Sequence, residues 1–217
     1  MPLALFDLDN TLLQGDSDYA WGEFLVEKGM VDAIAHQREN DRFYQQYLDG
    51  ELDINEFLRF QLRPLAENPL SRLEQWRNQY LQEYIRPMIS PQARALVEKH
   101  RARGDIAVII TATNSFVTRP IADLFGVEHL IATEPEMIAG EYTGGVSGLP
   151  SYREGKVIRL REWLSEHDQT LADSWFYSDS HNDLPLLESV ENPVAVNPDA
   201  RLQSIAKKRQ WPILHLS

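Results

Sequence analysis

Residues 3–13, LALFDLDNTLL, form the stretch around which the rest of this chain is organised. Residues 3–6 are all apolar, and so short a run predicts a buried strand of a parallel sheet. Asp7 and Asp9 follow at once, and the alternation of a strand would place both carboxylates on the same side. An uncompensated carboxylate at the edge of a core costs roughly several kcal/mol. We therefore expect a divalent cation here, because hard cations prefer oxygen ligands.

The composition is that of an acidic globular protein. The chain has 217 residues, of which 43% are hydrophobic and 25% are charged, with a formal net charge of -12 and no cysteine. The negative charge argues against nucleic acid and anionic membranes as partners. The lack of cysteine excludes disulfides and thiolate metal sites. No basic leader or run of about 18 apolar residues is visible, so we expect a cytoplasmic protein without a signal peptide or membrane span.

Residues 14–86 have helical periodicity and contain no convincing strand. Four helices are expected, at about residues 19–29, 31–47, 53–62 and 71–84. Ser17 or Asp18 is predicted to cap the first helix, and Pro64 and Pro69 to bracket a loop. An insertion at this point would lie over the carboxyl ends of the strands, where ligands bind in open α/β sheets. Its expected role is a lid that excludes water.

From residue 91 onward, amphipathic helices alternate with short apolar strands. Strands are expected at residues 106–110, 129–132, 174–178, 193–196 and 211–214, and a hairpin at 137–144. Helices are expected at residues 93–104, 115–125, 153–166, 184–190 and 200–208. The pattern predicts an α/β fold with a doubly wound parallel sheet. Residues 1–13 and 87–217 would form its core domain, and residues 14–86 an inserted helical cap domain.

Polar side chains collect where the predicted strands end. Asp7 and Asp9 follow the first strand, Thr111 follows the second, and Asp179 and Asp183 follow the strand at 174–178. The carboxyl ends of parallel strands meet at one crevice, so these side chains are expected to lie together.

The same positions carry a resemblance to a known family. Residues 7–11, DLDNT, resemble the DxDxT signature of the haloacid dehalogenase superfamily. Residues 178–183, SDSHND, stand where its phosphoserine-phosphatase-like branch, subfamily IB, has GDGxND, and Thr111 and Lys156 fall between them in the family's order. The resemblance covers essentially the whole chain and implies a Rossmann-type core with a cap. It implies a phosphatase, because relatives with dehalogenase activity lack the second carboxylate, here Asp9.

The resemblance also implies a role for each of these residues. Asp7 would attack phosphorus and form an aspartyl phosphate, and Asp9 would protonate the leaving oxygen and then activate water. Lys156 would offset the negative charge of the site. The implied cofactor is Mg²⁺, held by Asp7, the backbone carbonyl of Asp9 and Asp179, with Asp183 binding through water or orienting Asp179.

Further residues are expected to bind the phosphate and the substrate. Thr111 and backbone N–H groups near Ala112 would hold phosphate oxygens, helped by the helix that starts at residue 115. Asn182 is also assigned to substrate binding, with a role as a helix cap as its alternative.

Two departures from the family pattern bear on the substrate. Asp16 stands nine residues after Asp7, where phosphoserine phosphatases have a Glu that holds the substrate ammonium. The cap arginine that pairs with the carboxylate of serine has no unambiguous match, the candidates being Arg38, Arg42, Arg59 and Arg63. We therefore expect a small phosphomonoester that carries an amine and no carboxylate, with histidinol phosphate as the candidate, and a monomer or homodimer as the assembly.

Other functions stay open on the sequence. Phosphoserine phosphatase is the alternative activity. The alternatives of another class are a catalytically silent module that binds a phosphometabolite and a structural protein on this fold. Retention of Asp7, Asp9, Lys156 and Asp179 together favours the enzyme.

Overall fold

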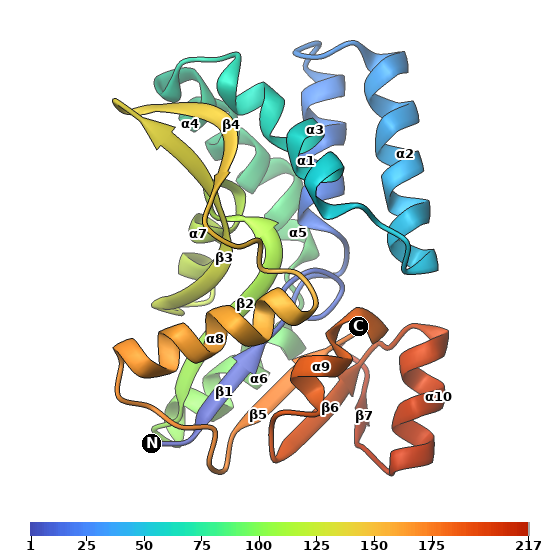
Figure 1. The fold of residues 1–217 in the computed structure, drawn as a ribbon, viewed down its shortest axis with the longest axis vertical. Helices are drawn as coiled ribbons and strands as arrows, with labels where there is room; N and C mark the ends of the chain where they lie inside the picture. Colours follow the sequence, from blue (N-terminus) through green and yellow to red (C-terminus); the bar gives the residue numbers. More distant parts are fainter. Residues whose placement is uncertain (217) are drawn as a thin grey trace.

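The computed structural model describes residues 1–216, and in this range seven strands form one sheet (Figure 1). The strands lie in the order β4-β3-β2-β1-β5-β6-β7. They are β1 (Leu3–Phe6), β2 (Ile106–Asn114), β3 (His129–Ile138), β4 (Glu141–Ser147), β5 (Trp175–Ser178), β6 (Asn192–Val196) and β7 (Ile213–Leu214). Neighbouring strands are parallel, except that β3 and β4 are antiparallel.

β1 lies at the centre of the sheet and is buried on both faces. Leu3 and Leu5 belong to the apolar cluster on one face, and Ala4 and Phe6 belong to the cluster on the other. The first cluster includes side chains from α8 (Glu154–Glu166), α9 (Leu184–Leu187) and α10 (Ala200–Arg209), and the second from α6 (Pro91–Ala102) and α7 (Ser115–Leu124). Burial on both faces explains the continuous apolar run of β1. The doubly wound α/β fold expected from the sequence is confirmed.

The remaining helices lie between β1 and α6 in the chain. They are α1 (Ser17–Glu27), α2 (Ala33–Asp49), α3 (Ile54–Ala66), α4 (Leu70–Tyr80), a π-helical turn (Leu81–Ile85) and α5 (Arg86–Met88). The two connections to the sheet run side by side, because Leu13 and Ile89 form an antiparallel bridge and Gln14 N–H donates to the Met88 carbonyl at 2.8 Å. The division into a cap of residues 14–86 and a core stays a prediction, since both contribute to one buried cluster.

Two predictions about helix ends are wrong, and each has a physical reason. The cap of α1 is Asp16, whose Oδ1 accepts hydrogen bonds from the N–H groups of Asp18 and Tyr19, both at 2.9 Å. Pro64 lies inside α3 and not in a loop. Its side chain is buried, so packing outweighs the helical hydrogen bond that a proline cannot make.

The hairpin at the edge of the sheet is longer than the sequence suggested. β3 continues past the expected residues 129–132 to Ile138 and pairs with β4. β4 packs on α3, where a Cβ built on Gly144 would lie 3.2 Å from the Cβ of Ala66. Gly144 also has a φ of +83°, which favours glycine. The hairpin therefore supports one side of the helical region.

Candidate active site

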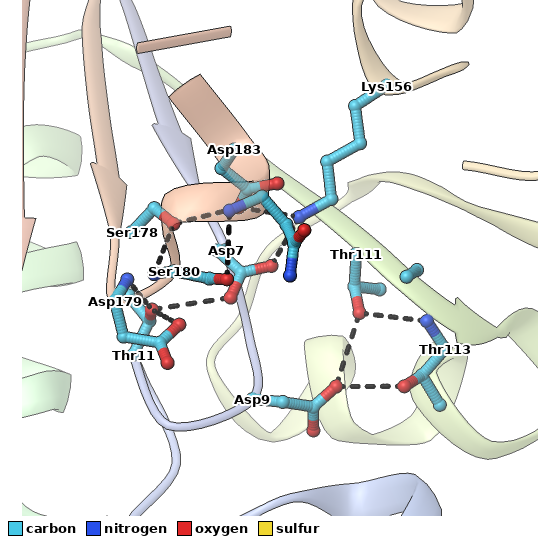
Figure 2. Close-up of polar contacts among 12 residues, drawn as sticks. Asp7, Asp9, Thr11, Thr111, Thr113, Lys156, Ser178, Asp179, Ser180 and Asp183 are labelled. Carbon is cyan, nitrogen blue, oxygen red and sulfur yellow. Dashed lines mark hydrogen bonds and ion pairs between the residues drawn. The ribbon is translucent and has the colours of Figure 1, made fainter. Parts of the chain in front are cut away.

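The turn after β1 places the first two aspartates in different surroundings. The carbonyl of Leu8 accepts a hydrogen bond from Leu12 N–H at 2.9 Å, and Asn10 has a φ of 56° in the left-handed region. Asp7 and Asp9 both line the same cavity, as expected. Figure 2 shows Asp7 directed toward Lys156 and Asp9 directed toward the residues of β2.

Lys156 of α8 lies between two buried carboxylates. Its Nζ is 2.7 Å from Oδ1 of Asp7 and 2.8 Å from Oδ2 of Asp183 (Figure 2). Burial acts to lower the pKa of Lys156, but Asp183 and Asp7 together raise it above its usual value. The Oγ of Ser178 donates to Asp183 at 2.8 Å, a contact that the sequence did not suggest. Lys156 is thus held as an ammonium against the expected nucleophile.

Thr11 connects the ends of β1 and β5. Its Oγ1 lies 3.3 Å from Oδ2 of Asp7 and 3.2 Å from Oδ1 of Asp179, and it accepts from Asp179 N–H at 3.0 Å. Thr11 was not among the site residues predicted from the sequence. Its position as the threonine of the DxDxT signature was the signal that could have identified it as a site residue.

The negative charge at this point exceeds the positive charge. Asp7, Asp179 and Asp183 are buried around one ammonium, that of Lys156. Burial raises the pKa of Asp7 to about 7, against the opposing effect of Lys156, and with a further rise from Asp183. Burial, Asp7 and Asp183 raise the pKa of Asp179 well above its usual value. An excess of buried carboxylate oxygens is the donor set that a hard divalent cation prefers.

The carboxyl groups nevertheless form no complete metal cage. Within residues 1–216, no three histidine or acidic side chains converge closely enough to hold an ion by themselves. The expected ligand set, in which Asp7 and Asp179 bind through carboxylates and Asp9 contributes its backbone carbonyl, stays a prediction. Open positions filled by water and phosphate are typical of Mg²⁺ sites in phosphoryl-transfer enzymes.

Asp9 is held by donors from α1 and β2. Its Oδ1 accepts from Ser17 N–H at 2.7 Å, and its Oδ2 accepts from Thr113 Oγ1 at 2.8 Å and lies 3.4 Å from Thr111 Oγ1. Burial raises the pKa of Asp9 to about 6, with a further rise from Asp16. This suits a group that must carry and release a proton. Thr113 was missed, although it shares a strand face with Thr111.

The four residues expected to bind phosphate or substrate all line the cavity: Thr111, Ala112, Asp16 and Asn182. Asn182 also contacts the helical region, since its Nδ2 lies 3.4 Å from the carbonyl of Tyr47. Its Oδ1 accepts from Arg153 Nε at 3.0 Å. Arg153, which the sequence analysis did not single out, also donates to the carbonyl of Gly50.

The part of the cavity that the helical region lines is acidic and aromatic. Its residues are Asp16, Asp18, Tyr19, Asn40, Phe43, Tyr44, Tyr47, Leu52, Ile54, Phe57 and Gln61. Within residues 1–216, no arginine lines the cavity, so none of the four candidates does. Arg42 is instead paired with Glu39 at 2.8 Å and Glu56 at 2.9 Å. Among the described residues, this part of the cavity therefore offers no cationic side chain to a substrate carboxylate.

This chain is similar in sequence to known proteins. The family model for haloacid dehalogenase-like hydrolases matches residues 4–188. The chain is 48% identical over 217 residues to a protein named histidinol-phosphatase from Neisseria meningitidis serogroup C (strain 8013), covering 98% of each chain.

Solved structures show the same fold. A protein with unknown function from Bordetella pertussis Tohama I has a TM-score of 0.94 at 47% identity, covering 100% of this chain and 99% of that one. A phospho-aspartyl intermediate analogue of phosphoserine phosphatase has a TM-score of 0.72 at 18% identity, covering 100% and 93%, and is alike in fold alone. The family match spans most of the chain and includes the strand ends that form the site. The chain belongs to the haloacid dehalogenase-like hydrolases.

Proposed function

We propose that this hydrolase removes phosphate from a small phosphomonoester that carries a cationic nitrogen group, and that histidinol phosphate is its substrate. The observation that carries the proposal is the lining of the cavity. Besides Lys156, this lining includes the carboxylates of Asp16 and Asp18 and several aromatic rings, and within residues 1–216 no arginine belongs to it. An amine or imidazole fits such a lining, because both can donate to a carboxylate and pack on a ring. The identity to a relative named histidinol-phosphatase supports the same substrate.

The proposed reaction has two steps. A carboxylate oxygen of Asp7 attacks phosphorus, the ester P–O bond breaks, and Asp9 gives its proton to the departing alkoxide. Asp9 then takes a proton from water as the water oxygen attacks phosphorus. The acyl phosphate bond breaks, which frees Asp7 and inorganic phosphate. Lys156 holds Asp7 in place and favours its ionised form for the attack.

The residues at the ends of β1 and β5 fit Mg²⁺. Asp7, Asp179 and the backbone carbonyl of Asp9 would hold it, and Asp183 would orient the group through its contacts with Lys156 and Ser178. When bound, the cation would neutralise charge on the phosphoryl oxygens, which is most of what phosphoryl transfer requires from a protein site.

The alternatives are less well supported. Phosphoserine would bring a carboxylate into a cavity lined by Asp16 and Asp18, where its charge would be repelled. A silent binding module would not need Asp9 to be held at a raised pKa. No helix within residues 1–216 is long and apolar enough to span a membrane.

The test is a comparison of substrates with the full chain and Mg²⁺. Release of inorganic phosphate is measured from histidinol phosphate, phosphoserine and p-nitrophenyl phosphate, each with and without a chelator. We expect kcat/KM for histidinol phosphate to exceed that for phosphoserine by about a hundredfold or more, since a like charge is rejected strongly. Equal rates on the two substrates would contradict the proposed specificity, and no turnover of any of them would contradict the enzyme itself.

A further inference from the structure

Asp18 is a buried acid whose Oδ1 has no hydrogen-bond partner among residues 1–216. It lies in the first turn of α1, is 5% exposed and lines the cavity. Its Oδ1 is fully buried and has no hydrogen-bond partner in the part of the chain that the structure describes. Burial raises its pKa well above the usual value, and the charges of Asp16 and Asp9 raise it further. The fold therefore maintains an acceptor that it does not itself satisfy.

A purely structural role does not account for this side chain. An acidic residue in the first turn of a helix is favoured by the helix dipole, but that gain is small beside the cost of burying a charge without a partner. Asp16, two residues earlier, differs because its Oδ1 accepts hydrogen bonds from two backbone N–H groups. Of these two acids in the cavity, Asp18 is the one left for a ligand.

Other residues that line the cavity suit a flat polar ring. Tyr44 and Phe57 are aromatic side chains that are not fully buried, and Asn40 and Gln61 carry buried amides. The two amides contact each other at 3.5 Å, and Asn40 Nδ2 lies 3.5 Å from the carbonyl of Tyr19. Both distances are at the outer limit of a hydrogen bond, so the amides retain donor and acceptor capacity for a ligand.

We propose that Asp18 is a specificity-determining residue that accepts a hydrogen bond from the ring N–H of a nitrogen heterocycle, the imidazole of histidinol phosphate. This inference rests on the proposed function and extends it by naming the part of the substrate that is recognised. Asp16, which accepts hydrogen bonds from the backbone of α1, would bind the ammonium group near the ester.

The experiment compares the full chain with Asp18→Asn and with Glu23→Gln, a matched loss of an exposed acid from the same helix. The substrates are histidinol phosphate and O-phosphoethanolamine, which has the amine but no ring. We expect Asp18→Asn to lower kcat/KM for histidinol phosphate by about tenfold or more and for O-phosphoethanolamine by much less. Glu23→Gln should behave as the unaltered chain. Equal losses on both substrates, or no loss on histidinol phosphate, would overturn the proposal.

Failure of the proposed function is distinguishable from failure of this inference. If the unaltered chain does not turn over histidinol phosphate, inhibition of p-nitrophenyl phosphate hydrolysis by histidinol tests Asp18 directly. Inhibition that weakens about tenfold in Asp18→Asn supports the ring contact, and inhibition that is absent or equal in both proteins overturns it. The thermal midpoint should not fall in Asp18→Asn, because asparagine has the same shape and the substitution breaks no hydrogen bond to Oδ1. A clear fall would mark a structural residue and overturn the proposal.

Discussion

The guanidinium of Arg153, at the start of α8, donates to the carbonyl oxygen of Gly50, the residue that caps the C-terminal end of α2. Arg201 of α10 donates from Nη1 to the neighbouring carbonyl of Asp49 at 3.3 Å. The last carbonyls of a helix lack partners within the helix and carry partial negative charge. The two arginines therefore connect α8 and α10 to the C-terminal end of α2.

Loss of Arg153 should loosen this connection. Its backbone has φ 50° and ψ -119°, a region that disfavours any residue with a Cβ, so Arg153→Gly relieves backbone strain while it removes the guanidinium. We expect stability to hold or rise, KM for the substrate to rise about fivefold, and amide exchange in α2 to become faster. Arg209→Ala, which removes a surface arginine paired with Glu188, is the control. An unchanged KM would show that Arg153 does not hold the site closed.

Asp7→Asn should abolish turnover and preserve the fold. Asparagine keeps an oxygen that can accept from Lys156, but the amide is not a nucleophile. We expect kcat to fall about a thousandfold or more, with little change in the thermal midpoint. In the unaltered chain, mass spectrometry of acid-quenched enzyme should find a phosphoryl group on the peptide that contains residue 7. Phosphate release at the normal rate from Asp7→Asn would refute the aspartyl-phosphate mechanism.

Activity should depend on Mg²⁺ and on Asp179. A cation relieves the mutual repulsion among the buried Asp7, Asp179 and Asp183. Mg²⁺ should therefore raise the thermal midpoint of the unaltered chain, and it should raise that of Asp179→Ala much less. Excess Ca²⁺ should inhibit, because calcium prefers more ligands and a looser shell. Full activity after exhaustive chelation would contradict the metal site.

Asp16→Asn tests the amine side of the substrate. Asparagine caps helices about as well as aspartate, so α1 should keep its start and the fold should be unaffected. We expect kcat/KM to fall about tenfold or more for histidinol phosphate and O-phosphoethanolamine, and much less for p-nitrophenyl phosphate. A uniform loss on all three substrates would assign Asp16 to the geometry of the site and not to the amine.

A buried histidine away from the site should make stability depend on pH. His100 Nδ1 lies 2.7 Å from Asp105 Oδ2, and its Nε2 lies 2.7 Å from the hydroxyl of Tyr177. Burial lowers the pKa of His100, and Asp105 opposes this. As pH falls below about 6.5, the unfolded chain takes up the proton first, so stability falls toward acid until the lower folded pKa is reached.

Tyr177→Phe checks this network by urea unfolding at pH 7.5 and pH 5.5. The substitution removes the hydroxyl that donates to Nε2 of the neutral His100 ring. We therefore expect the free energy of unfolding to fall by about 1 kcal/mol at pH 7.5. The further fall between pH 7.5 and pH 5.5 should be smaller than in the unaltered chain. A pH dependence equal to that of the unaltered chain would exclude His100 as its source.

The sequence determined the elements whose causes are local. A continuous apolar run specifies a strand buried on both faces, and a 3.6-residue period specifies an amphipathic helix, so β1 and most helices were predicted within a few residues. The order of the motifs around Asp7, Thr111, Lys156 and Asp179 placed the site at the strand ends and led to the correct family. Oligomeric state and compartment stay predictions.

Only the tertiary structure decided which side chains of the site have hydrogen-bond partners. Thr11, Thr113 and Ser178 joined the site because strands distant in sequence bring their hydroxyls to carboxylates, and no local pattern reports such a contact. Packing likewise kept arginines out of the cavity lining and left Asp18 buried without a partner. Hydrogen bonding and desolvation depend on every neighbour in space, whereas periodicity and turn chemistry depend on a few neighbours in the chain. The sequence therefore located the chemistry, and the fold set its charge balance and specificity.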